Sequence, residues 1–189
     1  MIEFDFKELS PEDVLEEWQE WFNSDHTQEY TRSGRKIKIA ELKDSIERGK
    51  KQGNLLTFGI RDVQKDQIFG TAKLGPIDHF HGLADFAIFI GDKNYLGKGL
   101  SSKLIELGCA MAFEKYEVRK LHGGILERNT ASLKAYTRAG WIAEGVLRSH
   151  YENNGVYQDW IMISKYNPRF YSGEEFNTHA IDLAKYLKK

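Results

Sequence analysis

The chain has 189 residues and a formal net charge of −1, from 27 lysines and arginines against 28 aspartates and glutamates. That length fits one domain with a sizeable core, and the near-neutral balance provides no long-range field to attract nucleic acid. The single cysteine, Cys109, excludes an intramolecular disulfide and a cysteine metal cluster. The first residues do not resemble a secretory signal, and no apolar run approaches the ~20 residues of a membrane span. We therefore expect a cytoplasmic protein with neither nucleic acid nor a membrane as partner.

The N-terminal part of the chain predicts a strand followed by two helices. Residues 2–6 alternate apolar and acidic side chains, as in a strand with one buried face. The sequence Ser-Pro-Glu-Asp at 10–13 is typical of a helix start. Residues 23–37 are polar and predict a loop, and a second amphipathic helix is predicted over 38–51. The first helix is expected to bury Val14, Leu15, Trp18, Trp21 and Phe22.

Three strands are predicted in close order in the middle of the chain, over 55–61, 68–77 and 83–90. A glycine turn at 97–99 follows the third strand. It leads into a helix that begins at Leu100, where apolar residues recur at helical spacing. The glycine turn therefore lies between the end of a strand and the start of a helix.

The C-terminal part predicts a strand over 121–126, a helix capped by Asn129 and stopped by Gly140, and a final hairpin. The hairpin strands run over 141–149 and 156–165 and are joined by an Asn-Gly turn. The last residues carry an amphipathic stripe of Phe176, Ala180, Leu183, Ala184 and Leu187. That stripe predicts burial against the sheet edge, in a second copy of the chain as a homodimer, or against another partner.

Antiparallel strands interrupted by helices favour a mixed sheet with helices on its faces. We expect one α/β (α+β) domain over residues 1–166, with a mixed, mostly antiparallel central sheet of about seven strands flanked by helices. Residues 167–189 form a C-terminal tail with the extra helix.

The glycine turn is the first candidate binding element. Gly97 and Gly99 let the backbone approach a ligand, and the N–H groups of the following first helical turn form an anion site suited to phosphate. Lys98, Ser101 and Ser102 could add donors. The spacing matches neither a Walker loop nor a dinucleotide-binding loop, and simple chain reversal would explain the same glycines.

The second candidate is a polar face on the helix that follows Asn129. Ser132 and Tyr136 come three and seven residues later, which places all three polar groups on one side of that helix. A plain cap and a half-buried core tyrosine are the alternatives. The two patterns together are more specific than either alone.

Two longer segments enclose these patterns: Ile90-Gly91-Asp92-Lys93-Asn94-Tyr95-Leu96-Gly97-Lys98-Gly99-Leu100 and Asn129-x-x-Ser132-x-x-x-Tyr136-x-x-Ala139-Gly140-Trp141. They are followed by Glu144-Gly145-x-x-Arg148 and Gly155-x-Tyr157-x-Asp159. The first pair resembles the acetyl-CoA motifs of the GNAT superfamily of N-acetyltransferases. The second pair is similar to the branch with ribosomal-protein alanine, polyamine and amino-sugar-nucleotide acetyltransferases. The resemblance implies the acyl-CoA N-acyltransferase fold over 1–166, with acetyl-CoA as co-substrate and no metal.

Three positions depart from the superfamily pattern. Leu96 stands where arginine or glutamine is usual, Ser101 where glycine or alanine is usual, and Trp141 replaces a common phenylalanine. The change at Leu96 removes one side-chain contact to the pyrophosphate. Backbone N–H groups still supply most of the anion site, so cofactor binding is expected to survive.

The resemblance also implies roles for individual residues. Phe89 and Ile90 would pair their backbone with the pantetheine arm, and Asn129 would contact the pantetheine or the diphosphate. Tyr136 would donate a proton to the leaving thiolate. The pyrophosphate would be held by Leu96, Gly97, Lys98, Gly99, Leu100, Ser101 and Ser102.

The general base is less clearly marked in the sequence. Asp85 shares a strand face with Ala87 and Phe89 and is the best-placed carboxylate, although an exposed strand-end acid fits equally well. His79 and His81 are interpreted as solvated turn residues. Cys109 is interpreted as a core residue rather than a nucleophile. His150, Tyr151 and Asp159 in the final hairpin are predicted to line the acceptor site.

These residues predict acetyl transfer from acetyl-CoA to a primary amine by direct attack in a ternary complex. The acceptor is a small molecule or peptide, and a protein N-terminus, a polyamine and an amino sugar nucleotide all stay open. Tyr30, Arg32 and Arg35 border the acceptor region by resemblance, where arginines would favour an acidic acceptor or form a solvated surface. The alternative function is a non-catalytic acyl-CoA-binding sensor or scaffold.

Overall fold

A seven-stranded sheet forms the centre of the molecule in the computed structural model, which describes residues 3–30, 35–153, 155–172 and 181–187. The strand order is β1-β2-β3-β4-β5-β7-β6, and every neighbouring pair is antiparallel except β4 and β5. The mixed, mostly antiparallel sheet of the sequence analysis is thus confirmed. The strands are β1 (Phe4–Glu8), β2 (Leu56–Asp62), β3 (Gln67–Asp78), β4 (Leu83–Ile90), β5 (Lys120–Leu126), β6 (Ile142–Asn153) and β7 (Val156–Tyr166).

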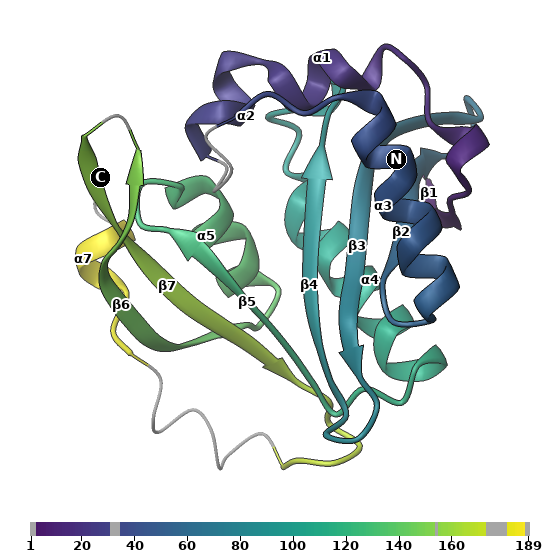
Figure 1. Ribbon diagram of the computed structural model, residues 1–189. Coiled ribbons are helices and arrows are strands. Elements are labelled where there is room, and N and C mark those ends of the chain that lie inside the picture. The colour runs from purple at the N-terminus through teal and green to yellow at the C-terminus, as the bar shows by residue number, and fades with distance from the viewer. Residues whose placement is uncertain (1–2, 31–34, 154, 173–180, 188–189) are drawn as a thin grey trace.

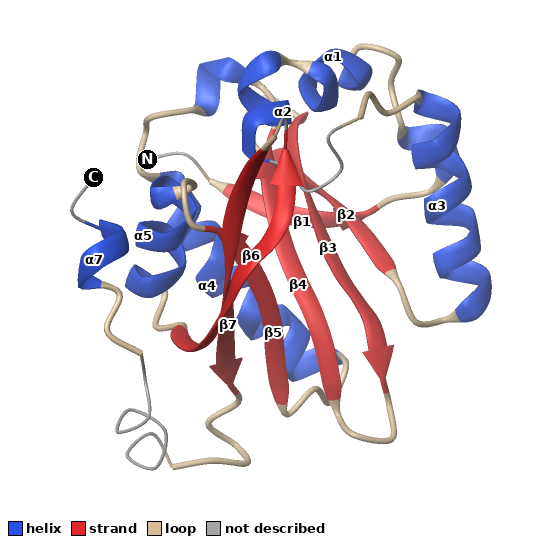
Figure 2. Ribbon diagram, turned by 60° about the vertical axis from the view of Figure 1, so that its left-hand side comes forward, coloured by secondary structure: helices blue, strands red, loops and turns tan. Residues whose placement is uncertain are grey.

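Helices cover both faces of this sheet. Figures 1 and 2 show α3 on one face and α4 with α5 on the other, while α1 and α2 lie near the carboxyl end of β4. Within the described residues, no helix is both long and apolar enough to cross a membrane. The helices are α1 (Trp18–Asn23), α2 (Asp25–Tyr30), α3 (Ile39–Gln52), α4 (Leu100–Lys115), α5 (Thr130–Arg138) and α7 (Ala184–Leu187), with 3-10 turns η1 (Pro11–Asp13) and η2 (Lys93–Tyr95).

Two apolar clusters hold the layers together. The main core lies between the sheet and α4 and α5, and includes Phe69, Phe86 and Leu104. A smaller cluster joins α1 and α3 and consists of Leu9, Val14, Trp18, Ile39, Leu42 and Ile46. The buried residues of α3 include Ile39, Leu42 and Ile46, as expected for the predicted amphipathic helix. The helix ends at Gly53, whose φ of +67° suits glycine.

The prediction of one continuous first helix from residue 10 is wrong, because the segment forms the short turn η1 and then the separate helix α1. The Ser10 N–H donates to the Asp13 carboxylate at 2.8 Å, and Lys7 Nζ donates to the same group at 2.7 Å. This local network completes a short η1 turn, after which Val14 is extended with φ −80° and ψ 116°. Leu15, expected to be buried, is 52% exposed.

The predicted loop over 23–37 is also wrong in part, because residues 25–30 form α2. The hydroxyls of Ser24 and Thr27 stabilise the start of this helix. Ser24 Oγ accepts the Thr27 N–H at 3.3 Å, and Thr27 Oγ1 donates to the Trp21 carbonyl at 2.7 Å. Arg32 lies outside the described residues.

The described part of the C-terminal tail packs within its own chain. The Ile181 N–H donates to the Ala143 carbonyl on the edge strand β6, and Tyr186 is buried in the main core. Leu183 and Leu187 of the predicted stripe pack against the same core. Phe176 and Ala180 lie outside the described residues. Residues 181–187 therefore cover the sheet edge, the first of the three expected arrangements.

Candidate active site

The sheet separates between its two parallel strands. β4 pairs with β5 only through Leu83, Ala84 and Asp85. Beyond Asp85, β4 continues along β3 as far as Ile90, whereas β5 continues along β7 as far as Leu126. The two strands diverge visibly in Figure 1. The β4 backbone from Phe86 onward therefore has no strand partner on its β5 side.

Tyr136 of α5 reaches this point of separation. Its hydroxyl donates to the Phe86 carbonyl at 3.5 Å, and its ring packs edge-on against Trp141 with centroids 4.9 Å apart. Burial raises the pKa of the Tyr136 hydroxyl, and a backbone hydrogen bond with Ile88 opposes that shift. The phenol is therefore protonated at neutral pH and held against two peptide groups of β4.

The start of α5 carries two further polar groups. The Asn129 side chain accepts the Ser132 N–H at 3.1 Å and so caps the helix, as the sequence predicts. The Nε and Nη2 atoms of Arg128 are buried without a hydrogen-bond partner within the described residues. A buried guanidinium without acceptors is costly and suits an anionic ligand. Arg128 is not among the residues predicted from the sequence, although its place between a strand end and the Asn129 cap could have marked it.

The glycine turn is anchored on one side and open on the other. Tyr95 is buried, stacks on Phe69 at 4.1 Å, and donates its hydroxyl to Asp62 at 2.8 Å. Gly97 and Gly99 have φ values of +72° and +70°, and no atom lies within 4 Å of where a Cβ would stand. The turn thus requires glycine for its conformation and leaves space beside its backbone.

This turn opens the 16-residue helix α4, with Gly99 as its N-cap and no side-chain cap. The first N–H groups of a helix have no partner within it, and the helix dipole favours negative charge there. Leu96, Gly97 and Lys98 are exposed, and Ser101 and Ser102 are half-buried. The residues present therefore fit a phosphate-bearing ligand such as the pyrophosphate of acetyl-CoA.

The other predicted residues of β4 lie around the same separation. Phe89 and Ile90 pair with Thr71 and Gly70 of β3, and the Phe89 ring stacks on Phe22 of α1 at 4.8 Å. Asp85 is half-buried and is the last β4 residue paired with β5. After burial, electrostatic interactions with Cys109 and then with Asp85 add to the raised pKa of Tyr136. Asp85 directly precedes Phe86, whose carbonyl accepts the Tyr136 hydroxyl.

Three other candidate residues lie in a surface turn or are held by contacts within the protein. His79 and His81 are exposed in the turn between β3 and β4, as expected. Asp159 forms an ion pair with Arg148 at 2.6 Å and accepts the Ser149 N–H at 3.0 Å. That N–H, followed by Arg148, lowers the pKa of Asp159.

Cys109 lies in the apolar core, as the sequence predicts. Its side chain is 3% exposed, and burial raises the pKa of the thiol to about 12. The thiolate is the nucleophilic form of cysteine, so this residue is inert at neutral pH.

Comparisons with known proteins agree with this geometry. Residues 4–142 match the acetyltransferase (GNAT) domain family. The "Probable N-acetyltransferase YjcK" of Bacillus subtilis is 27% identical over 139 residues, which cover 74% of this chain and 75% of that protein. Spermidine N(1)-acetyltransferase of Vibrio cholerae is 31% identical over 113 residues, which cover 58% of this chain and 64% of that enzyme.

Solved structures share the fold. Spermidine N-acetyltransferase from Vibrio cholerae in complex with CoA and spermine aligns with a TM-score of 0.79 and 22% identity, covering 88% of this chain and 97% of that one. Ribosomal-protein-S5-alanine acetyltransferase from Vibrio fischeri aligns with a TM-score of 0.74 and 20% identity, covering 89% and 96%.

Since the family match spans well over half of the sequence, the chain belongs to the GNAT acetyltransferase family. It is an acetyl-CoA-dependent N-acetyltransferase.

Proposed function

We propose that the chain transfers the acetyl group of acetyl-CoA to a primary amine by direct attack in a ternary complex. The observation that carries this proposal is the Tyr136 hydroxyl, held between β4 and β5 against the backbone of Phe86 and Ile88. A covalent acetyl-enzyme is not part of the proposal, because the Cys109 thiol is buried and protonated.

Acetyl-CoA would lie along the separation between the two strands. The pyrophosphate would meet the turn from Leu96 to Ser102 and the first N–H groups of α4, and the pantetheine arm would lie beside Phe89, Ile90 and Asn129. The open turn supports this placement, because no atom lies within 4 Å of where a Cβ of Gly97 or Gly99 would stand. We place this activity in residues 1–166 and propose residues 167–189 as a C-terminal tail.

Tyr136 would act as the proton donor. Attack of an amine on a thioester builds negative charge on the carbonyl oxygen and then on the departing sulfur. A neutral phenol at that position donates a hydrogen bond and then its proton, and the raised pKa of Tyr136 keeps it neutral before the reaction.

Asp85 would assist the attacking amine. A lysine-like amine of pKa ~10.4 loses its proton at pH 7 at a cost of about 4.6 kcal/mol, whereas an α-amine of pKa ~7.8 costs about 1.1 kcal/mol. A strongly basic acceptor therefore needs a base more than a peptide N-terminus does. Asp85 directly precedes Phe86, whose carbonyl accepts the Tyr136 hydroxyl, and is the carboxylate we propose for this role.

The acceptor would be one of three amine classes: a protein N-terminus, a polyamine or an amino sugar nucleotide. The relatives named for spermidine and for the S5 alanine support an amine acceptor without selecting among these.

Incubation of the full chain with labelled acetyl-CoA and one amine of each class tests the proposal. Transfer of label to an amine, with release of CoA thiol in equal amount, is the expected result. Binding of acetyl-CoA with no transfer to any class would instead identify a non-catalytic acyl-CoA sensor.

A further inference from the structure

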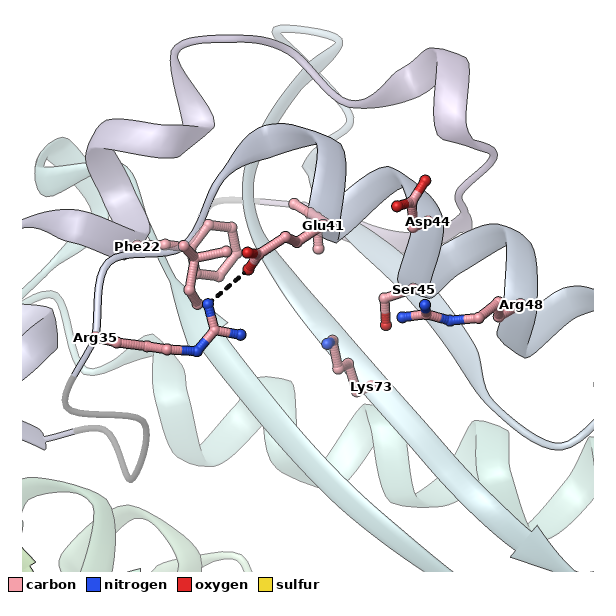
Figure 3. A pocket seen from close by; sticks show the side chains of 9 residues that line it. Phe22, Arg35, Glu41, Asp44, Ser45, Arg48 and Lys73 are labelled. Atoms are coloured by element: carbon pink, nitrogen blue, oxygen red, sulfur yellow. Dashed lines mark hydrogen bonds and ion pairs between the residues drawn. The ribbon is translucent and has the colours of Figure 1, made fainter.

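A cavity of about 340 Å³ is lined by residues of α3 and by Lys73 of β3. Figure 2 shows α3 on the face of the sheet opposite α4. Figure 3 shows Lys73 of β3 pointing into it, with Arg35 and Arg48 reaching toward the same space. Ser45 adds a hydroxyl, and Phe22, Ile37 and Leu42 supply an apolar wall. The cavity is therefore a positively charged recess with one apolar side.

Lys73 is the least compensated charge in this recess. It lies mid-strand between the buried Ala72 and Leu74, and its ammonium makes no hydrogen bond or ion pair in the described part of the chain. Burial lowers the pKa of Lys73, which means that the protein destabilises its charged form. A desolvated cation without a counter-charge is costly unless a ligand supplies one.

The two carboxylates at the cavity do not neutralise it. Glu41 is engaged by Arg35 at 2.8 Å. Asp44 also lines the cavity, but Figure 3 shows its carboxylate turned away from Lys73. Arg48 has neither an ion pair nor a hydrogen bond among the described residues. Lys73 and Arg48 thus keep their positive charge available to a ligand.

The cavity adjoins the separated strands from the α3 side. Lys73 is directly opposite Ala87 of β4, and residues opposite each other in an antiparallel pair lie on one face of the sheet. Ala87 stands between Phe86 and Ile88, whose backbones hold the Tyr136 hydroxyl. Phe22 lines the cavity and stacks on Phe89. The recess therefore borders the stretch of β4 where we place the thioester, and an acceptor that attacks the thioester from the α3 side can extend into it.

We propose that the cavity binds an acidic group of the acceptor, so that the acceptor is a primary amine that also carries a carboxylate or a phosphate. This inference rests on the proposed function. It limits the three acceptor classes named there to molecules that carry an anionic group as well as the amine. Lys73 and Arg48 would bind the anion, with Ser45 as an additional donor. A polyamine would bring further positive charge against Lys73 and is expected to be a poor acceptor.

Matched acceptor pairs test the proposal on the full chain. Glucosamine and glucosamine 6-phosphate differ only in a phosphate, and the amides of Ala-Gln and Ala-Glu differ only in a side-chain carboxylate; spermidine is the cationic comparison. We expect the acidic member of at least one pair to have a KM lower by a factor of at least about ten, and the pair identifies which acid is used.

Lys73→Met keeps an unbranched side chain as far as the ε position and removes the charged amino group. It should raise the KM for the acidic member by about tenfold or more and leave kcat/KM for the neutral member within about twofold. Arg48→Gln, on the exposed side of the cavity, should act in the same direction and does not disturb the core. Lys50→Met, exposed on the same helix and outside the cavity lining, should change neither value.

Calorimetric titration with the acidic probes separates this inference from the proposed function. Binding that Lys73→Met and Arg48→Gln both weaken, without acetyl transfer to any amine, supports the anion site and contradicts the proposed function. Acetyl transfer with equal kinetics for both members of each pair, or a preference for spermidine that Lys73→Met leaves unchanged, overturns the anion site and leaves the function standing.

Discussion

The glycine turn before α4 and the cavity under α3 lie on opposite faces of the same sheet and are built from different groups. At the turn, backbone conformation at Gly97 and Gly99 exposes N–H groups in one continuous stretch of chain. At the cavity, side chains from separate elements converge, with Lys73 from β3, Arg48 from α3 and Phe22 from α1. Binding through backbone N–H groups suits a cofactor that stays the same from one family member to another. A cavity lined by side chains can change its ligand preference through single substitutions. The acceptor side is therefore where specificity would be set.

The largest effect on turnover is expected at Tyr136, which we place between the cofactor and the acceptor. Tyr136→Phe removes the proposed proton donor and should lower kcat by about 10²- to 10⁴-fold, with little change in the KM for acetyl-CoA. Steady-state release of CoA thiol measures both. Tyr116→Phe, a half-buried tyrosine at the end of α4, is the matched control. Full turnover in Tyr136→Phe would show that the phenol is not the donor.

A tenfold effect is expected at the glycine turn. Gly99→Ala forces a side chain into φ +70°, at a cost of roughly 1–2 kcal/mol. Because a Cβ there meets no atom, the strain acts on the backbone alone, and the KM for acetyl-CoA should rise about tenfold. Gly145→Ala, also in open space but without a positive φ, should leave that KM unchanged. Equal effects of the two substitutions would contradict backbone binding.

A smaller effect, on stability, is expected at the cavity. Lys73→Met removes a partly buried charge that has no counter-ion in the described part of the chain, so the variant should melt a few degrees higher than the native chain. Differential scanning calorimetry without ligand checks this. A lower melting temperature would mean that the ammonium already has a stabilising partner in the free protein.

The smallest effect on turnover is expected at Cys109, whose replacement by alanine should keep kcat within about twofold of the native value. The contribution of the Cys109 thiol to the stability of the fold should depend on pH. Burial raises the thiol pKa from 9.0 to about 12, so its contribution to stability is present below pH 9 and is lost as the pH rises toward 12. Denaturant unfolding between these pH values should show a shallower loss in Cys109→Ala. Loss of turnover in this variant would point to a covalent intermediate.

The sequence predicted what depends on local patterns. The apolar periodicity of α3, the strand β4 and the Asn129 cap are each set by residues close together in the chain, and each matches the structure. The paired glycines at 97 and 99 were recognisable for the same reason, because the conformations they permit are a property of the turn itself.

The predictions failed, or missed a residue, where the local structure depends on contacts between residues far apart in the sequence. The helix expected from residue 10 is interrupted after η1, since Val14 and Trp18 both reach a small core shared with α3. Lys73 and Arg128 were missed because their significance lies in the partners they lack after folding. Arg35, which the resemblance placed at the border of the acceptor region, lines this cavity, and a lysine between the apolar residues Ala72 and Leu74 was a further signal in the sequence.

The most direct test of the division between the two faces is to measure the KM for acetyl-CoA and the KM for an acidic acceptor in both Gly99→Ala and Lys73→Met. We predict a crossed result: Gly99→Ala raises the KM for acetyl-CoA alone, and Lys73→Met raises the KM for the acceptor alone. If each variant instead raised both KM values by a similar factor, the two faces would not act as separate binding sites.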